Sequence, residues 1–198
     1  YNLFNQSIVN SPQYQPFLMT MDNHFYSTEG AVLTDEKIED WSNYLGISYD
    51  DAHYLVYKST KSSIDQLTKS GKSSDSKLKF ANADFIKKHK QALLYLSYAK
   101  YLEPYMNHNY IDTGDSWSYI ERSDKNATQL DNLKVMKVLE SSYKAETDPA
   151  LKMRYAYQMV RFAHYSNQYN EAINLFNKYV VPLNQKSVMY YYTLDQKA

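Results

Sequence analysis

The residues of this chain that could carry out chemistry are scattered, and few stand at the spacings a known reaction needs. Asp112-Thr113-Gly114 has the form of a catalytic aspartate triplet. The hydrolysis that uses such a triplet needs two carboxylates that share one proton, and the sequence contains the triplet once. Gly114-Asp115-Ser116 could present a nucleophilic serine, but the downstream Asp-x-x-His that should accompany it is missing. We interpret both motifs as a polar turn, because short motifs without their structural context are mostly accidental.

Metal, thiol and cofactor chemistry find no better support. The five histidines form neither a His-x₃-His nor a His-Glu-x-x-His pattern; they are His24, His53, His89, His108 and His164. His108 with Asp112 would supply two ligands, whereas a zinc site needs three or four. The chain has no cysteine, so a thiolate ligand or nucleophile is excluded. We therefore predict no catalytic residue, no metal site and no cofactor.

Composition restricts the class of protein further. The 22 basic and 22 acidic side chains balance, so nothing indicates general affinity for nucleic acid. No apolar run approaches the roughly 18 residues of a transmembrane segment. The chain begins with Tyr1 rather than Met, which is compatible with a removed signal peptide. A cysteine-free, tyrosine-rich composition favours a periplasmic or outer-surface location, and a cytoplasmic one stays open.

The elements that must position these residues are predicted to be helices. Residues 1–33 show aromatics without a clear period, and we expect an irregular segment packed on the helices. Apolar residues then recur at helical spacing through residues 34–198. We expect the longest helix to run from Lys77 or Asp84 to Glu103. No segment alternates as a strand should, so the predicted fold class is all-α.

Residues 148–183 are the most informative stretch. Asp148 followed by Pro149 is a helix start, since Asp caps free backbone N–H groups and Pro lacks one. A polar turn at 166–168 separates this helix from a second, which Pro182 should end. We expect the first helix to bury one face, made of Leu151, Tyr155, Met159 and Phe162.

This pair of helices resembles one tetratricopeptide repeat, whose period is 34 residues. The sequence YNEAI at 169–173, followed by Phe176, is similar to the start of the second helix of that family. Ala156, Val160 and Asn167 depart from its usual residues. The resemblance implies an α-α superhelix, a tetratricopeptide-like array of helical hairpins from about residue 127. We expect the array to be cut at residue 198, as the front part of a longer protein.

In the family the first helix of each repeat lines a concave groove. The resemblance therefore places five side chains on such a groove: Arg154, Tyr157, Arg161, His164 and Tyr165. Arg and Tyr suit contacts with a peptide backbone and its carboxylates. The alternative is that these residues are simply the polar face of a helix.

The surplus of tyrosine, 22 of 198 residues, also has two interpretations. Tyrosines at helical spacing can fill wide gaps between helices with their hydroxyls at the rim. Aromatics in the loop that follows Pro104 have less reason to be there for packing. Tyr105, Tyr110 and Trp117 are therefore candidates for stacking on a sugar or peptide.

The leading hypothesis is a non-enzymatic helical-repeat protein that binds a protein or peptide, as a scaffold or assembly module. The alternative is a surface glycan-binding lipoprotein, similar to the helical binding proteins of outer-membrane starch-uptake systems. That alternative predicts a coplanar set of exposed Trp and Tyr rings and a lipidated Cys just before Tyr1. A third hypothesis is a helical appendage to an enzyme domain beyond residue 198.

Overall fold

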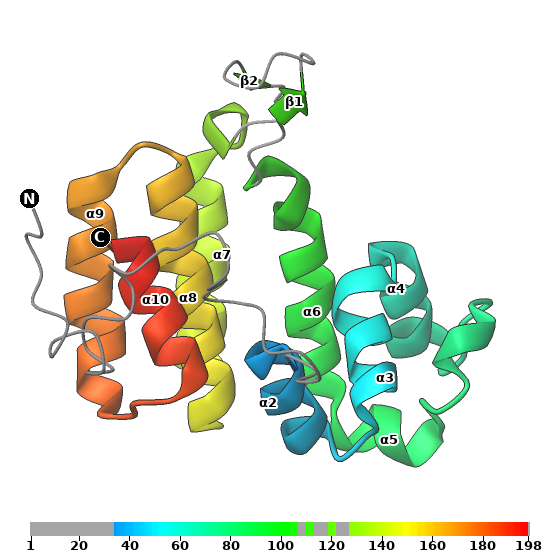
Figure 1. Ribbon diagram of the computed structural model, residues 1–198. Coiled ribbons are helices and arrows are strands. Elements are labelled where there is room, and N and C mark those ends of the chain that lie inside the picture. The colour runs from blue at the N-terminus through cyan, green and yellow to red at the C-terminus, as the bar shows by residue number, and fades with distance from the viewer. Residues whose placement is uncertain (1–33, 107–109, 113–118, 122–126, 198) are drawn as a thin grey trace, which may run out of the picture. The chain divides into compact units, whose positions relative to one another are not determined.

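A computed structural model of the chain is shown in Figure 1. It describes residues 34–106, 110–112, 119–121 and 127–197. The chain divides into two units, Tyr1–Thr34 and Asp35–Ala198, and every element given below belongs to the second. The irregular segment expected at 1–33 lies outside the described residues. The described part is mostly helical, consistent with the all-α prediction.

The second unit begins with three short helices: α2 (Glu36–Leu45), α3 (Tyr49–His53) and α4 (Lys61–Ser70). A π-helical turn, η2 (Tyr54–Lys58), extends α3. Gly46 and Gly71 end α2 and α4 in the left-handed conformation that favours glycine. Ser48 caps α3 as its sequence predicts.

The expected long helix up to Glu103 is wrong, because the chain breaks it at His89. The stretch from Ser76 to Leu102 instead forms a 3₁₀ turn, η3 (Ser76–Leu78), and two helices, α5 (Ala83–Lys88) and α6 (Lys90–Leu102). His89 has φ −108° and ψ 23°, outside helical geometry. Its buried ring lies 4.8 Å from the Phe85 ring and 6.3 Å from the Tyr44 ring, so packing fixes the break.

A short antiparallel hairpin follows the 3₁₀ turn η4 (Glu103–Tyr105). Strands β1 (Tyr110–Asp112) and β2 (Tyr119–Glu121) pair with Ile111 opposite Ile120. The sequence predicts a loop here and no strand. Three residues per strand are too few for alternation to stand out.

The C-terminal part consists of α7 (Asn132–Ala145), α8 (Pro149–Tyr165), α9 (Tyr169–Leu175) and α10 (Val188–Lys197). A 3₁₀ turn, η5 (Ala127–Gln129), precedes α7, and two turns join α9 to α10: η6, a π-helical turn (Phe176–Val180), and η7, a 3₁₀ turn (Val181–Leu183). Asp148 caps α8 and Pro149 is its first residue, as predicted.

Helix α8 lies at the centre of the core, in contact with α6, α7, α9 and α10 (Figure 1). The sequence predicts that α8 buries one face, but the helix is buried on several sides. The buried residues include Met153, Ala156, Val160 and Ala163 besides the predicted stripe. Small and flexible side chains let the neighbouring helices approach. The face assigned to an open groove is thus largely covered by other helices.

Candidate functional site

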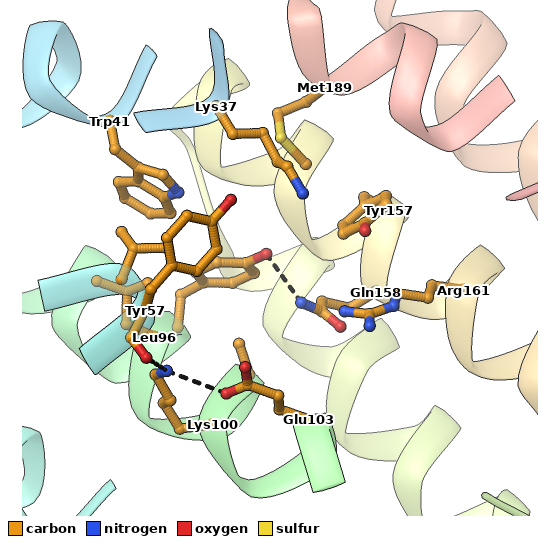
Figure 2. Close-up of a pocket in the computed structure, with 13 residues that line it drawn as sticks. Lys37, Trp41, Tyr57, Leu96, Lys100, Glu103, Tyr157, Gln158, Arg161 and Met189 are labelled. Atoms are coloured by element: carbon orange, nitrogen blue, oxygen red, sulfur yellow. Dashed lines mark hydrogen bonds and ion pairs between the residues drawn. The ribbon is translucent and has the colours of Figure 1, made fainter. Parts of the chain in front are cut away.

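A pocket lies where α2, η2, α6, α8 and α10 meet (Figure 2). Its volume is about 100 Å³, below the roughly 300–1,000 Å³ of pockets for drug-sized ligands. It therefore has room for one side chain or a chain end. The residues that line it are Lys37, Trp41, Val56, Tyr57, Tyr95, Leu96, Ala99, Lys100, Glu103, Tyr157, Gln158, Arg161 and Met189.

Lys37 brings the first positive charge to the pocket. It is the second residue of α2. The helix starts at Glu36 because the Asp35 carboxylate accepts hydrogen bonds from the backbone N–H groups of its first turn. Its ammonium lies 4.4 Å from the centre of the Tyr192 ring. Burial lowers the pKa of Lys37; Asp35 opposes that shift and the Arg161 guanidinium adds to it. Among the described residues no carboxylate forms an ion pair with Lys37.

Arg161 of α8 brings the second charge. One terminal N–H group of its guanidinium donates to the Met106 carbonyl at 2.9 Å. The guanidinium carbon lies 5.5 Å from the Tyr165 ring centre and 5.9 Å from that of Tyr157. An arginine has five N–H donors, and within the described part of the chain no acid is paired with this one.

Gln158 of α8 also lines the pocket and is 5% exposed. Its Nε2 donates to the Tyr95 hydroxyl at 3.2 Å. Its Oε1 is buried without a hydrogen-bond partner among the residues that the structure describes. A buried acceptor without a donor costs about 1–3 kcal/mol. Figure 2 shows the Lys37 ammonium, the Gln158 amide and the Arg161 guanidinium turned toward the same space.

The remaining charges of the pocket neutralise each other. Lys100 and Glu103 form an ion pair at 3.0 Å, with the Lys100 side chain only 10% exposed. The Lys100 ammonium also donates to the Tyr57 carbonyl at 3.3 Å. The Tyr57 hydroxyl donates to Asp35 at 2.6 Å. Two cations, Lys37 and Arg161, therefore remain in the pocket wall without a paired acid among the described residues.

Two of the groove residues predicted from the sequence, Tyr157 and Arg161, line this pocket. The expectation that Arg154 lies on an open groove is wrong. Its side chain is 2% exposed, forms an ion pair with Asp40 of α2, and lies 4.1 Å from the Trp41 ring centre. Helix α2 covers this position, which the resemblance to an open repeat did not anticipate.

His164 and Tyr165, the last two predicted groove residues, lie outside the pocket lining. Both are half-buried. His164 Nδ1 is 3.0 Å from the Gln196 carbonyl, which connects α8 to the end of α10. Its ring also lies 5.5 Å from that of Tyr165. Packing against α10 therefore accounts for the position of His164.

The loop aromatics are only partly within the described residues. Tyr105 is half-buried in η4, 6.1 Å from the Tyr101 ring. Trp117 and the side chain of Tyr110 lie outside the described residues, so stacking by these two stays a prediction.

Sequence reasoning missed Lys37, Lys100 and Gln158. The lysines looked like ordinary surface charges, since nothing local shows that α2 and α6 meet α8. Gln158 did carry a signal: it is an amide in a run of apolar neighbours from Ala156 to Val160. A polar residue on a helix buried all round needs a partner.

A second, wider depression lies between the start of α7 and the turn before α9. Its lining is rich in amides and includes the exposed ring of Tyr169. The lining residues are Asn132, Leu133, Met136, Asn167, Gln168, Tyr169, Asn170, Glu171 and Asn174. Asn132 Oδ1 is buried there, with no hydrogen-bond partner in the described part of the chain.

Comparison with known proteins gives no relative. No family model, no curated protein and no solved structure matches this chain. Among the described residues there is no group of three or more potential metal ligands, and no helix is both long and apolar enough to span a membrane.

Proposed function

We propose that this chain is a non-enzymatic, tetratricopeptide-like helical-repeat protein that binds a partner protein or peptide. The partner would be held at the pocket between α2, α6, α8 and α10. The observation that carries the proposal is the pair of cations, Lys37 and Arg161, facing a pocket beside the unpartnered acceptor of Gln158.

The packing of the C-terminal helices supports the repeat part of the proposal. Helix α8 packs on α7 before it and on α9 and α10 after it. In an array of helical hairpins each helix contacts its neighbours in this sequential way. Asn167, at the turn between α8 and α9, has φ 60°, the left-handed conformation for which the family uses glycine.

The walls of the pocket support a protein ligand. Aromatic side chains and arginine are the residue types most enriched at protein–protein hot spots. Trp41, Tyr57 and Tyr157 line this pocket together with Arg161. A pocket of about 100 Å³ suits one anchoring group of a partner, with further contacts outside it.

The proposal is tested by affinity capture with the purified full chain from envelope and soluble fractions of the source cell. The wild type is compared with the double variant Lys37→Met/Arg161→Met and with Lys87→Met. Lys87 is an exposed residue of α5 outside the pocket and controls for loss of one charge. We expect a partner that binds the wild type and Lys87→Met and is lost from the double variant, confirmed with purified partner. Equal capture by all three proteins would contradict the assignment of the pocket.

The amide-rich depression between α7 and α9 favours a second candidate, a glycan-binding function. Amides donate to and accept from sugar hydroxyls, and the Tyr169 ring, 55% exposed, offers a stacking surface. Affinity electrophoresis in gels that contain a polysaccharide tests it. Retardation of the wild type that Tyr169→Ala abolishes would support this function, and equal mobility with and without polysaccharide would exclude it for that sugar.

A further inference from the structure

We infer that the pocket binds the free C-terminal carboxylate of the partner chain. This inference rests on the proposed function and adds the chemical group that is recognised. It combines three features of the pocket wall: the unpaired charges, the unpartnered amide oxygen and the aromatic lining.

The two cations of the pocket wall can bind one carboxylate between them. Lys100 and Glu103 cancel each other, so the uncompensated lining charges are Lys37 and Arg161. Each has N–H donors to spare, since Arg161 uses one of its five on Met106. A carboxylate has two oxygens, and these can accept charge-assisted hydrogen bonds from two cations at once. Its negative charge would also relieve the repulsion between Lys37 and Arg161.

A carboxylate alone would leave the acceptor of Gln158 without a hydrogen-bond donor. Its Oε1 is buried and lacks a donor. In the last residue of a peptide, the amide nitrogen and the carboxylate are bonded to the same carbon, Cα. A chain end can therefore donate that N–H to Gln158 while its carboxylate meets Lys37 and Arg161. Capture of a free C-terminal carboxylate is an established mode of peptide recognition.

The aromatic and apolar part of the lining fits the terminal side chain. Trp41, Tyr57, Tyr157 and Met189 contribute to it. These groups favour an apolar or aromatic last residue, because burial of apolar area stabilises the complex. The small volume limits entry to a chain end and excludes a folded surface.

Other anions match the pocket less well. A phosphate dianion would balance both cations, but it brings no N–H donor for the buried Oε1 of Gln158. In an internal Asp or Glu the backbone N–H is one or two carbons further from the carboxylate, so its spacing differs from that of a chain end. The free chain end is therefore the ligand that satisfies all three groups.

The test uses the immobilised full chain and short random peptides with an acetylated N-terminus. One library has a free C-terminal carboxylate and its twin a C-terminal amide. We expect retained free-acid peptides to exceed amidated ones by at least about tenfold, since a charge-assisted hydrogen bond contributes that much. Lys37→Met, Arg161→Met and Gln158→Met should each reduce retention, whereas Lys87→Met should not. Circular dichroism checks that every variant is folded.

Two further amidated libraries, one with an internal Asp and one with phosphoserine, test the other anions. If they are retained as strongly as the free acids, the inference is wrong. It is also wrong if free-acid and amidated peptides are retained equally or if neither is retained. Should a captured partner still depend on Lys37 and Arg161, the proposed function stands while the C-terminal inference fails. If capture of the partner does not depend on Lys37 and Arg161, the proposed function itself is wrong.

Discussion

Arg154 shows how far a residue's role depends on what packs against it. The resemblance to a tetratricopeptide repeat implies a groove residue, yet its guanidinium is enclosed by Trp41, Tyr44 and Asp40 of α2. A buried cation over two aromatic faces with one carboxylate partner stabilises the docking of α2. Arg161, two turns further along α8, keeps N–H donors for a ligand.

We predict that Arg154→Met lowers the free energy of unfolding by about 2–4 kcal/mol. Breaking a buried ion pair costs about 3–5 kcal/mol, and the Asp40 side chain, 30% exposed, reduces that cost. Arg161→Met, which leaves no acid unpaired among the described residues, should cost less than about 1 kcal/mol. Urea denaturation at neutral pH measures both. Equal losses would show that α2 is not held by Arg154.

A prediction about alkaline pH follows from the buried tyrosines. Burial raises the pKa of Tyr98 to about 12 and the pKa of Tyr95 above its ordinary value. The unfolded chain loses these protons near pH 10, before the folded chain does. Stability from these groups is thus complete below pH 10 and is lost as the pH rises toward 12.

Lys37 acts in the opposite direction. Its folded pKa is lowered, so the unfolded chain binds more protons and stability rises with pH up to about its unfolded value of 10.5. We expect urea midpoints to rise slightly up to about pH 10 in the wild type and to fall above it, in step with tyrosinate absorbance. In Lys37→Met the initial rise should be smaller. Stability that stayed constant beyond pH 12 would contradict the burial of Tyr95 and Tyr98.

At the scale of the elements, several helix ends are predicted by local signals, whereas features that depend on tertiary packing are not. Gly46, Gly71 and Asp148-Pro149 mark helix ends through their own backbone preferences, which sequence shows directly. The break at His89 depends on its ring packing against Phe85 and Tyr44, which only the folded chain reveals. The hairpin at 110–121 has strands of three residues each and gave no periodic signal.

Asp148 connects two helices, so its removal should cost more than a cap alone. Its carboxylate accepts from the backbone N–H of Ala150 at 2.8 Å and from the Tyr44 hydroxyl of α2 at 2.7 Å. A cap contributes about 1 kcal/mol and a hydrogen bond to a charged group about 1.5–3 kcal/mol. We predict that Asp148→Ala lowers the free energy of unfolding by about 2–4 kcal/mol. Tyr44→Phe should lose only the contribution of the hydrogen bond to the carboxylate, about 1.5–3 kcal/mol.

The double variant Asp148→Ala/Tyr44→Phe separates these contributions. Because the two side chains share one hydrogen bond, it should be little less stable than Asp148→Ala alone. Additive losses in chemical denaturation would mean that Tyr44 and Asp148 stabilise the fold independently.

The turn between α8 and α9 gives a further prediction. Asn167 adopts φ 60°, which costs a residue with a Cβ about 1–2 kcal/mol and a β-branched residue more. We expect Asn167→Gly to change the unfolding free energy by less than about 1 kcal/mol and Asn167→Val to lower it by about 1–2 kcal/mol. Melting temperatures in the reverse order would contradict the left-handed turn.

At the scale of the molecule, the helical class followed from composition and periodicity, but the pocket did not. Its wall is made by residues from α2, α6, α8 and α10, which are far apart in the sequence. Tyr157 and Arg161 were found because the repeat resemblance assigned a face of one helix. Lys37 and Gln158 were not, because they become a site only when α2 and α6 pack beside α8.

The most direct test of the account is a titration of the pocket with its own tryptophan. Trp41 lines the pocket, and Trp117→Phe leaves it as the only tryptophan of the chain. Peptides selected by the free-acid library are added to this protein and to the same protein carrying Lys37→Met/Arg161→Met. We predict a saturable change of fluorescence that weakens at least about tenfold in the variant. Binding of equal affinity in both proteins, or with no change at Trp41, would show that the ligand is held elsewhere.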